Sequence, residues 1–556
     1  MIQETVQDIP TYYYRDNFLR LCDSVERQYE DLLHSEERAF LRDFRRLSFA
    51  EQCLYVRLIS RTGPWFRESR LSYPEIGEEG RVIDALLENG FVHRAQRLAP
   101  QELAALFTQA ELRQAFAEHI DTAACKTKAA LLCSIEALQA TGEELLAISN
   151  AIDTQRIVAP EACEFVALLQ LLFFGNRRQS MTDFLLQDLG VVSYYPYSLD
   201  SAQRMFSVRE AVDEYLHFTA LADRHREIVE ADSRELLPAL ANEVLTQSPA
   251  HTSSRRRWDK LCNHLARDLE RQSSLSTAKA LYECSMRHPS RERRARIHEQ
   301  QNELAEAISL CEKILHEPWC EAELEAAGRI LPRAKRKLSG TPNRRRKETF
   351  PELSLNLPQV AEAVEISAAR ALERQWTQVH YVENTLMNGL FGLAFWEQIF
   401  APLPGAFTHP YQSVPLDMYD RDFRLQRDDA LSARLALLAE ADLSEIVSGA
   451  YARYQGYQCH WVNWKYLSAE LVAIAVKRIP RAHLLAIWDR LLFDPGENRK
   501  GFPDLVAFGD QPGEYAMIEV KGPGDKLQDS QKHWIRFFIE HDIPAQVAWV
   551  NWLERS

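Results

Sequence analysis

The chain has 556 residues, 46% hydrophobic and 26% charged, with a formal net charge of −14. At about 100–200 residues per domain, this globular composition predicts three or four domains. No run of about 18 apolar residues occurs, and the first ten residues lack the basic and apolar segments of a signal peptide. We therefore expect a cytoplasmic protein with no membrane partner. The ten cysteines include no CxxC pair, which argues against a zinc finger or ribbon.

The charge is unevenly distributed. Residues 251–350 carry 22 Lys and Arg against 14 Asp and Glu, a net of +8, which leaves −22 for the rest of the chain. Phosphate binding responds to the local field, so a basic segment in an acidic protein is a candidate DNA surface.

Residues 1–98 show helical spacing of apolar residues, followed by a short strand at 91–94. This order favours a winged-helix-like lobe that binds DNA. A helical lobe with basic solvated faces explains the same pattern equally well. The basic residues that we expect to contact DNA here are Arg42, Arg61 and Arg67.

Residues 99–145 predict helices at 100–106 and 109–119, then a loop and a third helix after Thr127. Thr127 is expected to cap that helix, and Lys126 and Lys128 would meet phosphates near its N-terminus. This arrangement resembles a SAP module, a small DNA-binding unit, although an ordinary amphipathic helix pair accounts for it as well.

Residues 146–331 predict long amphipathic helices, including segments at 278–286, 291–304 and 305–315 with a break at 288–290. Helix–turn–helix units with Ala, Leu and Tyr in the core resemble tetratricopeptide (TPR) repeats, but no clean period of 34 residues is present. Arg291, Arg293, Arg294 and Arg296 cannot all share one helix face. We expect some of the first three to reach DNA and the others to form ion pairs.

Residues 332–350 predict a basic linker, because Pro332, Gly340 and Pro342 interrupt helices and eight positive charges keep the segment solvated. It would tether two lobes and could also lie across DNA.

Residues 378–400 predict a long apolar helix with Glu383 in its apolar face. A carboxylate there is costly to bury unless it is paired or bound to a metal, and a salt bridge is the simpler explanation. Two further segments leave alternatives open. The aromatic run at 451–464 could stack on bases or form core, and we expect core. The acidic residues at 417–422 could suggest a second metal, and we expect a helix cap instead.

The segment 498–521 is the most informative. Two short apolar runs flank a turn at 509–513 and predict a β-hairpin. Asp504 opens its first strand and Glu519 lies near the end of the second, so the two become neighbours. Glu519 and Lys521 are two residues apart and point to the same face.

Such a set suits phosphodiester hydrolysis with Mg²⁺ or Mn²⁺, as one or two ions, because these cations prefer oxygen ligands. Asp504, Glu519 and the Val520 carbonyl would bind the metal, and Glu383 would complete the carboxylate ring. Lys521 would orient or deprotonate the attacking water. The alternative is a surface hairpin with a Glu/Lys pair.

The flanking residues decide between these alternatives. The strings RKGFPDLV at 499–506, IEVKGPGDKL at 518–527 and QKHWI at 531–535 resemble the VRR-NUC nuclease domain, and more closely the Fanconi-anaemia-associated nuclease family. The resemblance covers about residues 40–556. It implies that Glu383, Asp504, Glu519 and Lys521 match the family's catalytic positions and that Gln531 matches a helix residue near the active site. Arg499, in the first string, is a further candidate DNA contact.

The resemblance implies a mostly α, multidomain protein. Its helical or winged-helix-like lobe, SAP-like module and TPR-like middle would precede a restriction-endonuclease-like α/β domain of the PD-(D/E)xK type at 351–556. It also implies endonucleolytic cutting near 5′-flap or branched junctions, 5′→3′ exonuclease activity and a role in DNA interstrand-crosslink repair.

We expect a monomer that needs no small-molecule cofactor and associates with a bacterial nucleoid. No zinc finger is found, so ubiquitin-mediated recruitment is not expected, and no residues can be matched to a 5′-phosphate pocket. The rival functions are a Holliday-junction resolvase and a non-catalytic DNA-binding scaffold.

Overall fold

The computed structural model describes residues 11–61, 63–150, 152, 156–176, 192–340, 349–359 and 361–553. The chain divides into two compact units, Met1–Val192 and Ser193–Ser556. Among the described residues, none of the helices has the length and apolar character needed to cross a bilayer. All ten cysteines are free thiols, as their scattered positions predict.

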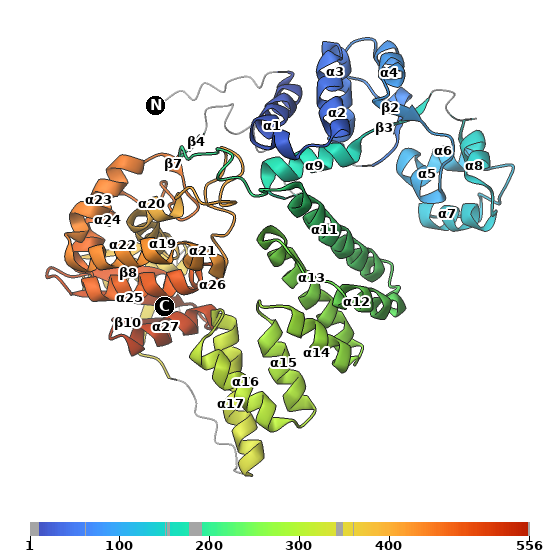
Figure 1. The fold of residues 1–556 in the computed structure, drawn as a ribbon. Helices are drawn as coiled ribbons and strands as arrows, with labels where there is room; N and C mark the ends of the chain where they lie inside the picture. Colours follow the sequence, from blue (N-terminus) through green and yellow to red (C-terminus); the bar gives the residue numbers. More distant parts are fainter. Residues whose placement is uncertain are drawn as a thin grey trace. The chain divides into compact units, whose positions relative to one another are not determined.

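The first unit contains a helical lobe and a small antiparallel sheet of order β1-β3-β2, blue to cyan in Figure 1. The predicted strand at 91–94 is β2, so the winged-helix-like order of helices followed by short strands is confirmed. α1 packs on α3 and α9, whose apolar faces form the core of the lobe. The elements of the lobe are α1 (Tyr13–Tyr29), α2 (Ser35–Arg46), α3 (Phe49–Ile59), β1 (Phe66–Arg67), α4 (Glu79–Glu88), β2 (Val92–Arg94), β3 (Ile157–Pro160) and α9 (Cys163–Phe174).

The SAP-like segment forms four short helices around its own apolar core. Thr127 caps the third of them as predicted, because its side chain accepts a hydrogen bond from the Ala130 N–H. The helices are α5 (Pro100–Leu106), α6 (Gln109–Ala115), α7 (Lys128–Ala137) and α8 (Gly142–Ser149).

After the short strand β4 (Ser193–Tyr194), the second unit continues with a run of helices, which we call the helical region (residues 209–339; green to yellow in Figure 1). The predicted break near 288–290 lies between α14 and α15. The helices are α11 (Arg209–Glu230), α12 (Leu237–Leu245), α13 (Thr252–Arg271), α14 (Leu275–Cys284), α15 (Ser290–Gln300), α16 (Leu304–His316) and α17 (Glu321–Ser339).

The predicted start of the basic linker, at Pro332, is wrong. α17 continues through Pro332 and ends at Ser339. A proline inside a helix costs about 3 kcal/mol, because it removes one hydrogen bond and crowds the preceding turn. Burial of Ala326, Ala327, Ile330 and Ala334, on a helix that packs on α15 and α16, outweighs that cost. Residues 341–348 lie outside the described residues.

The predicted nuclease domain, residues 349–553, is built on a five-stranded sheet of order β5-β10-β9-β8-β6. β6, β8 and β9 are antiparallel, whereas β10 runs parallel to both β9 and β5. α18 (Val364–Leu372) covers one face of the sheet, and α27 (Asp529–Glu540) packs with α19 (Thr385–Ala394) and α25 (Arg481–Phe493) in the core of the other. The strands are β5 (Glu352–Pro358), β6 (Gln378–Tyr381), β8 (Leu505–Phe508), β9 (Tyr515–Lys521) and β10 (Ala545–Leu553).

Two expectations for this domain have clear outcomes. The long helix over 378–400 is wrong at its start, because residues 378–381 pair with β8 as β6 and the helix begins at Thr385. Extended pairing satisfies the backbone of this segment, so its apolar residues do not extend the helix. The aromatic run is core, as expected: Tyr451, Tyr454 and Trp461 are buried in the main core of the domain.

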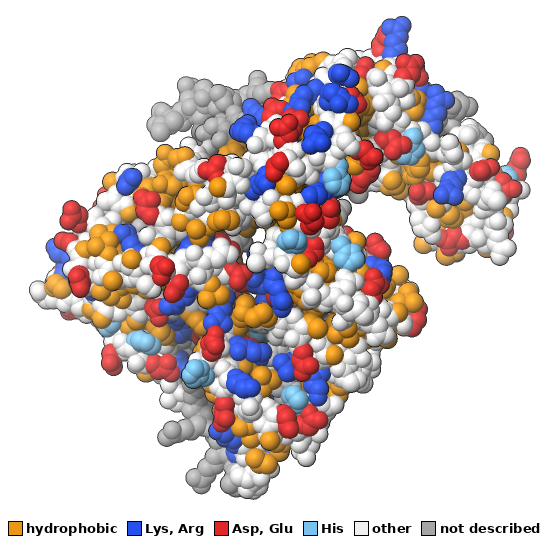
Figure 2. All heavy atoms as spheres, viewed as in Figure 1, with side chains coloured by type: hydrophobic (Ala, Val, Ile, Leu, Met, Phe, Trp, Pro, Cys, Tyr) orange, Lys and Arg blue, Asp and Glu red, His pale blue; other side chains and the backbone are white. Residues whose placement is uncertain are grey.

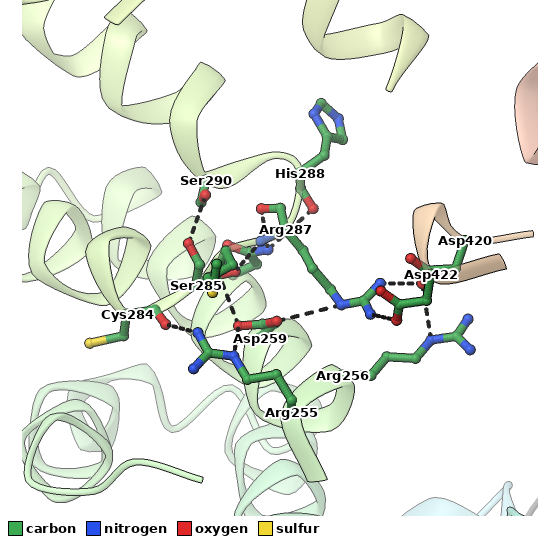
Figure 3. Close-up of polar contacts among 12 residues, drawn as sticks. Arg255, Arg256, Asp259, Cys284, Ser285, Arg287, His288, Ser290, Asp420 and Asp422 are labelled. Atoms are coloured by element: carbon green, nitrogen blue, oxygen red, sulfur yellow. Dashed lines mark hydrogen bonds and ion pairs between the residues drawn. The ribbon is translucent and has the colours of Figure 1, made fainter. Parts of the chain in front are cut away.

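A largely buried ion network joins the helical region to α21 (Arg421–Gln426) of the C-terminal domain (Figure 3). Arg287, between α14 and α15, forms ion pairs with Asp420 and Asp422, and its Nε lies 3.5 Å from Asp259 Oδ2 of α13. Arg256 Nε adds a contact of 3.3 Å to Asp420. The expectation of a helix cap at 417–422 is therefore wrong: Asp420 makes no side-chain cap, and these carboxylates neutralise arginines instead.

Candidate active site

The β8–β9 hairpin brings Asp504, Glu519 and Lys521 together as predicted. Leu505 pairs with Ile518, so the register continues to place Asp504 opposite Glu519. The Val520 N–H donates to Asp504 Oδ2 at 2.9 Å, and Lys521 Nζ lies 2.7 Å from Glu519 Oε1. One side of the hairpin thus presents two carboxylates and an ammonium group at the end of the sheet.

Glu383 joins this site from the turn after β6 rather than from a helix. The N–H groups of Val382 and Glu383 both donate to the Asp504 carbonyl oxygen, at 2.8 and 3.0 Å. Glu383 has a φ of +35°, which is unfavourable for a residue with a side chain and is typical of functional positions. Its carboxylate is exposed and accepts a hydrogen bond from the Tyr381 hydroxyl at 2.8 Å.

Burial shapes the electrostatics of the site. It raises the pKa of Glu519 to about 8, and the Asp504 charge adds to the effect while Lys521 opposes it. Burial also raises the pKa of Asp504 to about 6, against the opposing Val520 N–H and Lys521. Glu519 is 0% exposed, and its Oε2 has no hydrogen-bond partner among the described residues. Two desolvated carboxylates form a site that a divalent cation would stabilise.

The donor set fits such a cation only in part as it stands. In the part of the chain that the structure describes, no three His, Cys, Asp or Glu side chains are already grouped closely enough to hold a metal ion. The candidate ligands that lie together are the carboxylates of Asp504 and Glu519. Val520, the expected carbonyl ligand, follows Glu519 in β9, and its N–H is held by Asp504.

Glu365 is a residue that the sequence analysis missed. It lies in the first turn of α18, which packs on β8 and β9, and its charge raises the pKa of both Asp504 and Tyr381. Only the tertiary fold brings it near the hairpin, because nothing in its local sequence distinguishes it from an ordinary acidic residue at a helix start.

Gln531 lies in the first turn of α27, a helix position as the family resemblance implies. Its side-chain oxygen accepts a hydrogen bond from the Gln528 N–H at 2.9 Å and so caps α27. Within the described ranges, no hydrogen bond connects it to Asp504, Glu519 or Lys521.

Three of the expected DNA-binding residues line one cavity in the first unit. Arg61, Arg67 and Lys128 surround a space of about 420 Å³ together with Trp65 and Phe107. Arg67 pairs with Glu111 at 2.8 Å, whereas Lys128 Nζ donates to the carbonyls of Ala104 and Phe107 at 2.6 and 2.7 Å. The Arg67 and Lys128 side chains therefore already have polar partners within the protein.

The other expected contacts differ in exposure. The Arg42 side chain is 58% exposed beside Asp43, and Lys126 is exposed before α7. Arg291, Arg293 and Arg294 pair with Glu323, Glu270 and Glu283, and Arg296 pairs with Glu292. Figure 2 shows Lys and Arg interspersed with Asp and Glu on the visible face. Sequence patterning could not separate exposed cations from paired ones.

Arg499 lies in the segment that leads to Asp504. Its guanidinium is 4.6 Å from the Tyr419 ring centroid, and Nη1 is 3.5 Å from His460 Nε2. Its carbonyl accepts a hydrogen bond from Asn388 Nδ2 at 2.8 Å. The backbone before Asp504 is therefore fixed from α19.

Comparisons with known proteins identify the family of this chain. The family model for the VRR-NUC domain matches residues 439–552, and that for the FAN1 HTH domain matches residues 12–93. A Fanconi-associated nuclease 1 homolog of Pseudomonas aeruginosa is 36% identical over 546 residues, covering 97% of this chain and 96% of the relative. A homolog from Arabidopsis thaliana is 25% identical over 97% of this chain and 67% of its own length.

Solved structures match over nearly the whole chain. The crystal structure of paFAN1 bound to a 2-nt 5′-flap DNA with a gap has a TM-score of 0.81 and 34% identity, covering 98% of this chain and 99% of that chain. The corresponding structure with a 1-nt 5′ flap has a TM-score of 0.83, 35% identity, and coverage of 98% and 100%. This chain belongs to the Fanconi-associated nuclease 1 family of DNA-hydrolysing nucleases.

Proposed function

We propose that this nuclease is metal-dependent, recognises 5′-flap and related branched DNA, and cuts one strand near the junction. The observation that carries the proposal is the buried pair Asp504–Glu519 beside Lys521, because two desolvated carboxylates next to an ammonium group suit hydrolysis of an anionic diester.

Each residue has a proposed role. Asp504 and Glu519, with the Val520 carbonyl, would hold Mg²⁺ or Mn²⁺, and Glu383 would complete the set from the turn after β6. A bound metal would activate water and neutralise charge on the phosphate. Lys521 would leave Glu519 Oε1 to orient the attacking water and offset transition-state charge. Gln531 caps α27 in the free protein, and we propose that it lies near the active site.

The substrate proposal rests on the relatives. paFAN1 was crystallised on 5′-flap DNA, and the present chain matches it from end to end. We propose 5′-flap endonuclease and 5′→3′ exonuclease activities, and a role in interstrand-crosslink repair, for this chain too. The winged-helix-like lobe, the SAP-like module and the TPR-like helical region would hold the duplex arms by shape and phosphate rather than by base sequence. We propose that the protein acts as a monomer.

The test is cleavage of a labelled 5′-flap duplex with Mg²⁺, Mn²⁺ or EDTA, beside 3′-flap, four-way-junction and single-stranded controls. Asp504→Asn and Lys521→Met should lower the rate by roughly two or more orders of magnitude while flap binding in EDTA persists. Paired symmetric nicks in the four-way junction alone would favour a resolvase, and no cutting of any substrate would leave a DNA-binding scaffold.

A further inference from the structure

The segment 498–503, which we call the Asp504 loop, is held by one tryptophan of α27. The Trp534 indole N–H lies 3.1 Å from the Asn498 carbonyl oxygen and 3.0 Å from that of Lys500. The same ring stacks on Phe502 with centroids 4.0 Å apart. Trp534 therefore fixes the positions of three residues, Asn498, Lys500 and Phe502, in the segment that leads to Asp504.

Arg490 of α25 holds both Trp534 and the loop. Its guanidinium carbon lies 4.7 Å from the Trp534 ring centroid, and Nε lies 3.3 Å from Asn498 Oδ1. Asn498 Nδ2 donates back to the Arg490 carbonyl at 2.9 Å. A further bond of 3.3 Å runs from Arg490 Nη1 to the His533 carbonyl. Arg490 thus connects the start of the loop to α27.

The charge of Arg490 is neutralised from outside the nuclease domain. Arg490 Nη2 lies 2.6 Å from Glu321 Oε1, and the two side chains are only 10% and 16% exposed. Burial lowers the pKa of Arg490 and raises that of Glu321, so each group depends on the other. Glu321 is the first residue of α17, and its N–H also donates to Asp494 Oδ2 at 3.0 Å. Next to it on α17, Glu325 pairs with His533.

We infer that Glu321 and Arg490 are positioning residues for strand cleavage: α17 of the helical region, through this buried ion pair and Trp534, fixes the Asp504 loop in its active geometry. The inference rests on the proposed role of Asp504 in metal binding. It makes cleavage depend on a helix that contributes no group to the reacting atoms. Groups that orient metal ligands from behind commonly change metal affinity or activity by about 10–100-fold when altered.

The experiment uses the full chain with Glu321→Gln, a replacement of the same shape, and Arg490→Lys, which keeps the charge but loses the planar contact with Trp534. Asp489→Asn is the matched control. It breaks the half-exposed Arg424–Asp489 pair of 3.1 Å, one residue before Arg490 in the same helix. For each protein we would measure kcat and KM for flap DNA, the Mn²⁺ concentration at half-maximal rate, and Mn²⁺ binding by calorimetry without DNA.

We expect Glu321→Gln and Arg490→Lys to lower kcat about tenfold and to weaken Mn²⁺ binding by a similar factor, with KM for DNA within about twofold of wild type. Asp489→Asn should match wild type in all four measurements. Wild-type kcat and Mn²⁺ affinity in either folded variant would overturn the inference, as would a loss confined to KM. If Glu321→Gln unfolds below the assay temperature, the Arg490→Lys variant decides whether the inference holds. A wild-type protein that cuts no DNA would refute the proposed function alone, because calorimetry still tests the pair.

Discussion

Burial of the Glu519 carboxylate is the main free-energy cost of the candidate active site. Glu519 is fully buried on a strand that is itself buried throughout, and among the described residues only Lys521 offsets its charge at close range. A carboxyl group with a folded-state pKa of about 8 holds a proton at neutral pH that an ordinary glutamate has released. Binding of a cation would then release that proton. The free energy that burial of the carboxylate costs in the metal-free protein is therefore linked to its affinity for metal.

Stability in EDTA should reveal this cost. The unfolded-state pKa of Glu519 is near its usual 4.5 and the folded-state value is about 8. Between these two pH values the folded protein holds a proton on Glu519 that the unfolded protein has released. The contribution of Glu519 to the free energy of unfolding is therefore complete below about pH 4.5, falls as pH rises, and is lost above about pH 8. Relative to Glu519→Gln, wild type should lose on the order of 4 kcal/mol across this range. Thermal unfolding from pH 5 to 9 measures it.

Glu352→Gln, at an exposed position of β5, serves as the control and should follow wild type. Parallel curves for wild type and Glu519→Gln would show that Glu519 is not the titrating group.

The residues of the site differ in how far sequence could identify them. Asp504, Glu519 and Lys521 lie within one hairpin, where strand alternation fixes which side chains face the same way, so local pattern was sufficient. Glu365 reaches the site only because α18 packs against the sheet, and no local pattern encodes that. Glu383 was expected in a helix because of its apolar neighbours, but residues 378–381 pair with β8 and Glu383 lies in the turn that follows.

At the scale of elements, the contact between α27 and the Asp504 loop depends on Gly501. It has a φ of +85°, and a Cβ there would lie 2.7 Å from the Ser530 carbonyl carbon. Gly501→Ala should therefore push the loop from α27 and lower kcat about tenfold or more, since small misplacements of reacting groups are costly. Steady-state cleavage of the flap duplex measures the effect.

Gly456→Ala isolates the cause of that loss. Gly456 also has a positive φ, +93°, but no atom of the described residues outside its immediate chain neighbours lies within 4 Å of its Cβ position. The two variants share the backbone strain of about 1–2 kcal/mol, so a difference in kcat reports the clash with Ser530. Equal kcat values would mean that close contact with α27 is unimportant.

The Arg287 network of Figure 3 is the second place where elements of the helical region and nuclease domain depend on each other. Arg287→Met would remove the cation shared by buried Asp259 and Asp420 and leave each with one arginine, Arg255 and Arg256. A buried charge left with no partner costs about 3–5 kcal/mol, so the urea midpoint should fall by an amount toward the lower end of that range. Arg226→Met, which removes surface pairs with Asp223 and Glu230, should change stability by less than about 1 kcal/mol. Equal midpoints would refute the structural role of Arg287.

Long amphipathic helices were predictable at this scale because their apolar period repeats locally, and α14 to α16 begin and end within a few residues of expectation. The end of α17 was not predictable from local sequence. Pro332 stays within the helix because buried alanines of α17 pack on α15 and α16. Two partners of Arg287, Asp420 and Asp422, lie more than a hundred residues away along the chain. Sequence suggested that the acidic segment 417–422 mattered but could not supply the reason.

At the scale of the whole molecule, an acidic chain must bind a polyanion. The basic segment at 251–350 suggested a DNA surface, yet its arginines on α15 are already paired with glutamates. Charge that is neutralised within the protein releases few counterions from DNA. Exposed cations such as Arg42 and Lys126 should therefore carry more of the salt dependence than the denser arginine cluster.

Flap-DNA binding in EDTA at several salt concentrations tests this distribution. Arg42→Ala and Lys126→Ala should each reduce the slope of log Kd against log salt by about 1, the value for one lost phosphate contact. Arg293→Ala should leave the slope unchanged and lower stability instead, because Arg293 neutralises the largely buried Glu270. If Arg293→Ala reduces the slope as much as Lys126→Ala does, the α15 arginines must exchange glutamate for phosphate on binding. The helical region would then be part of the DNA surface despite its neutral face in the free protein.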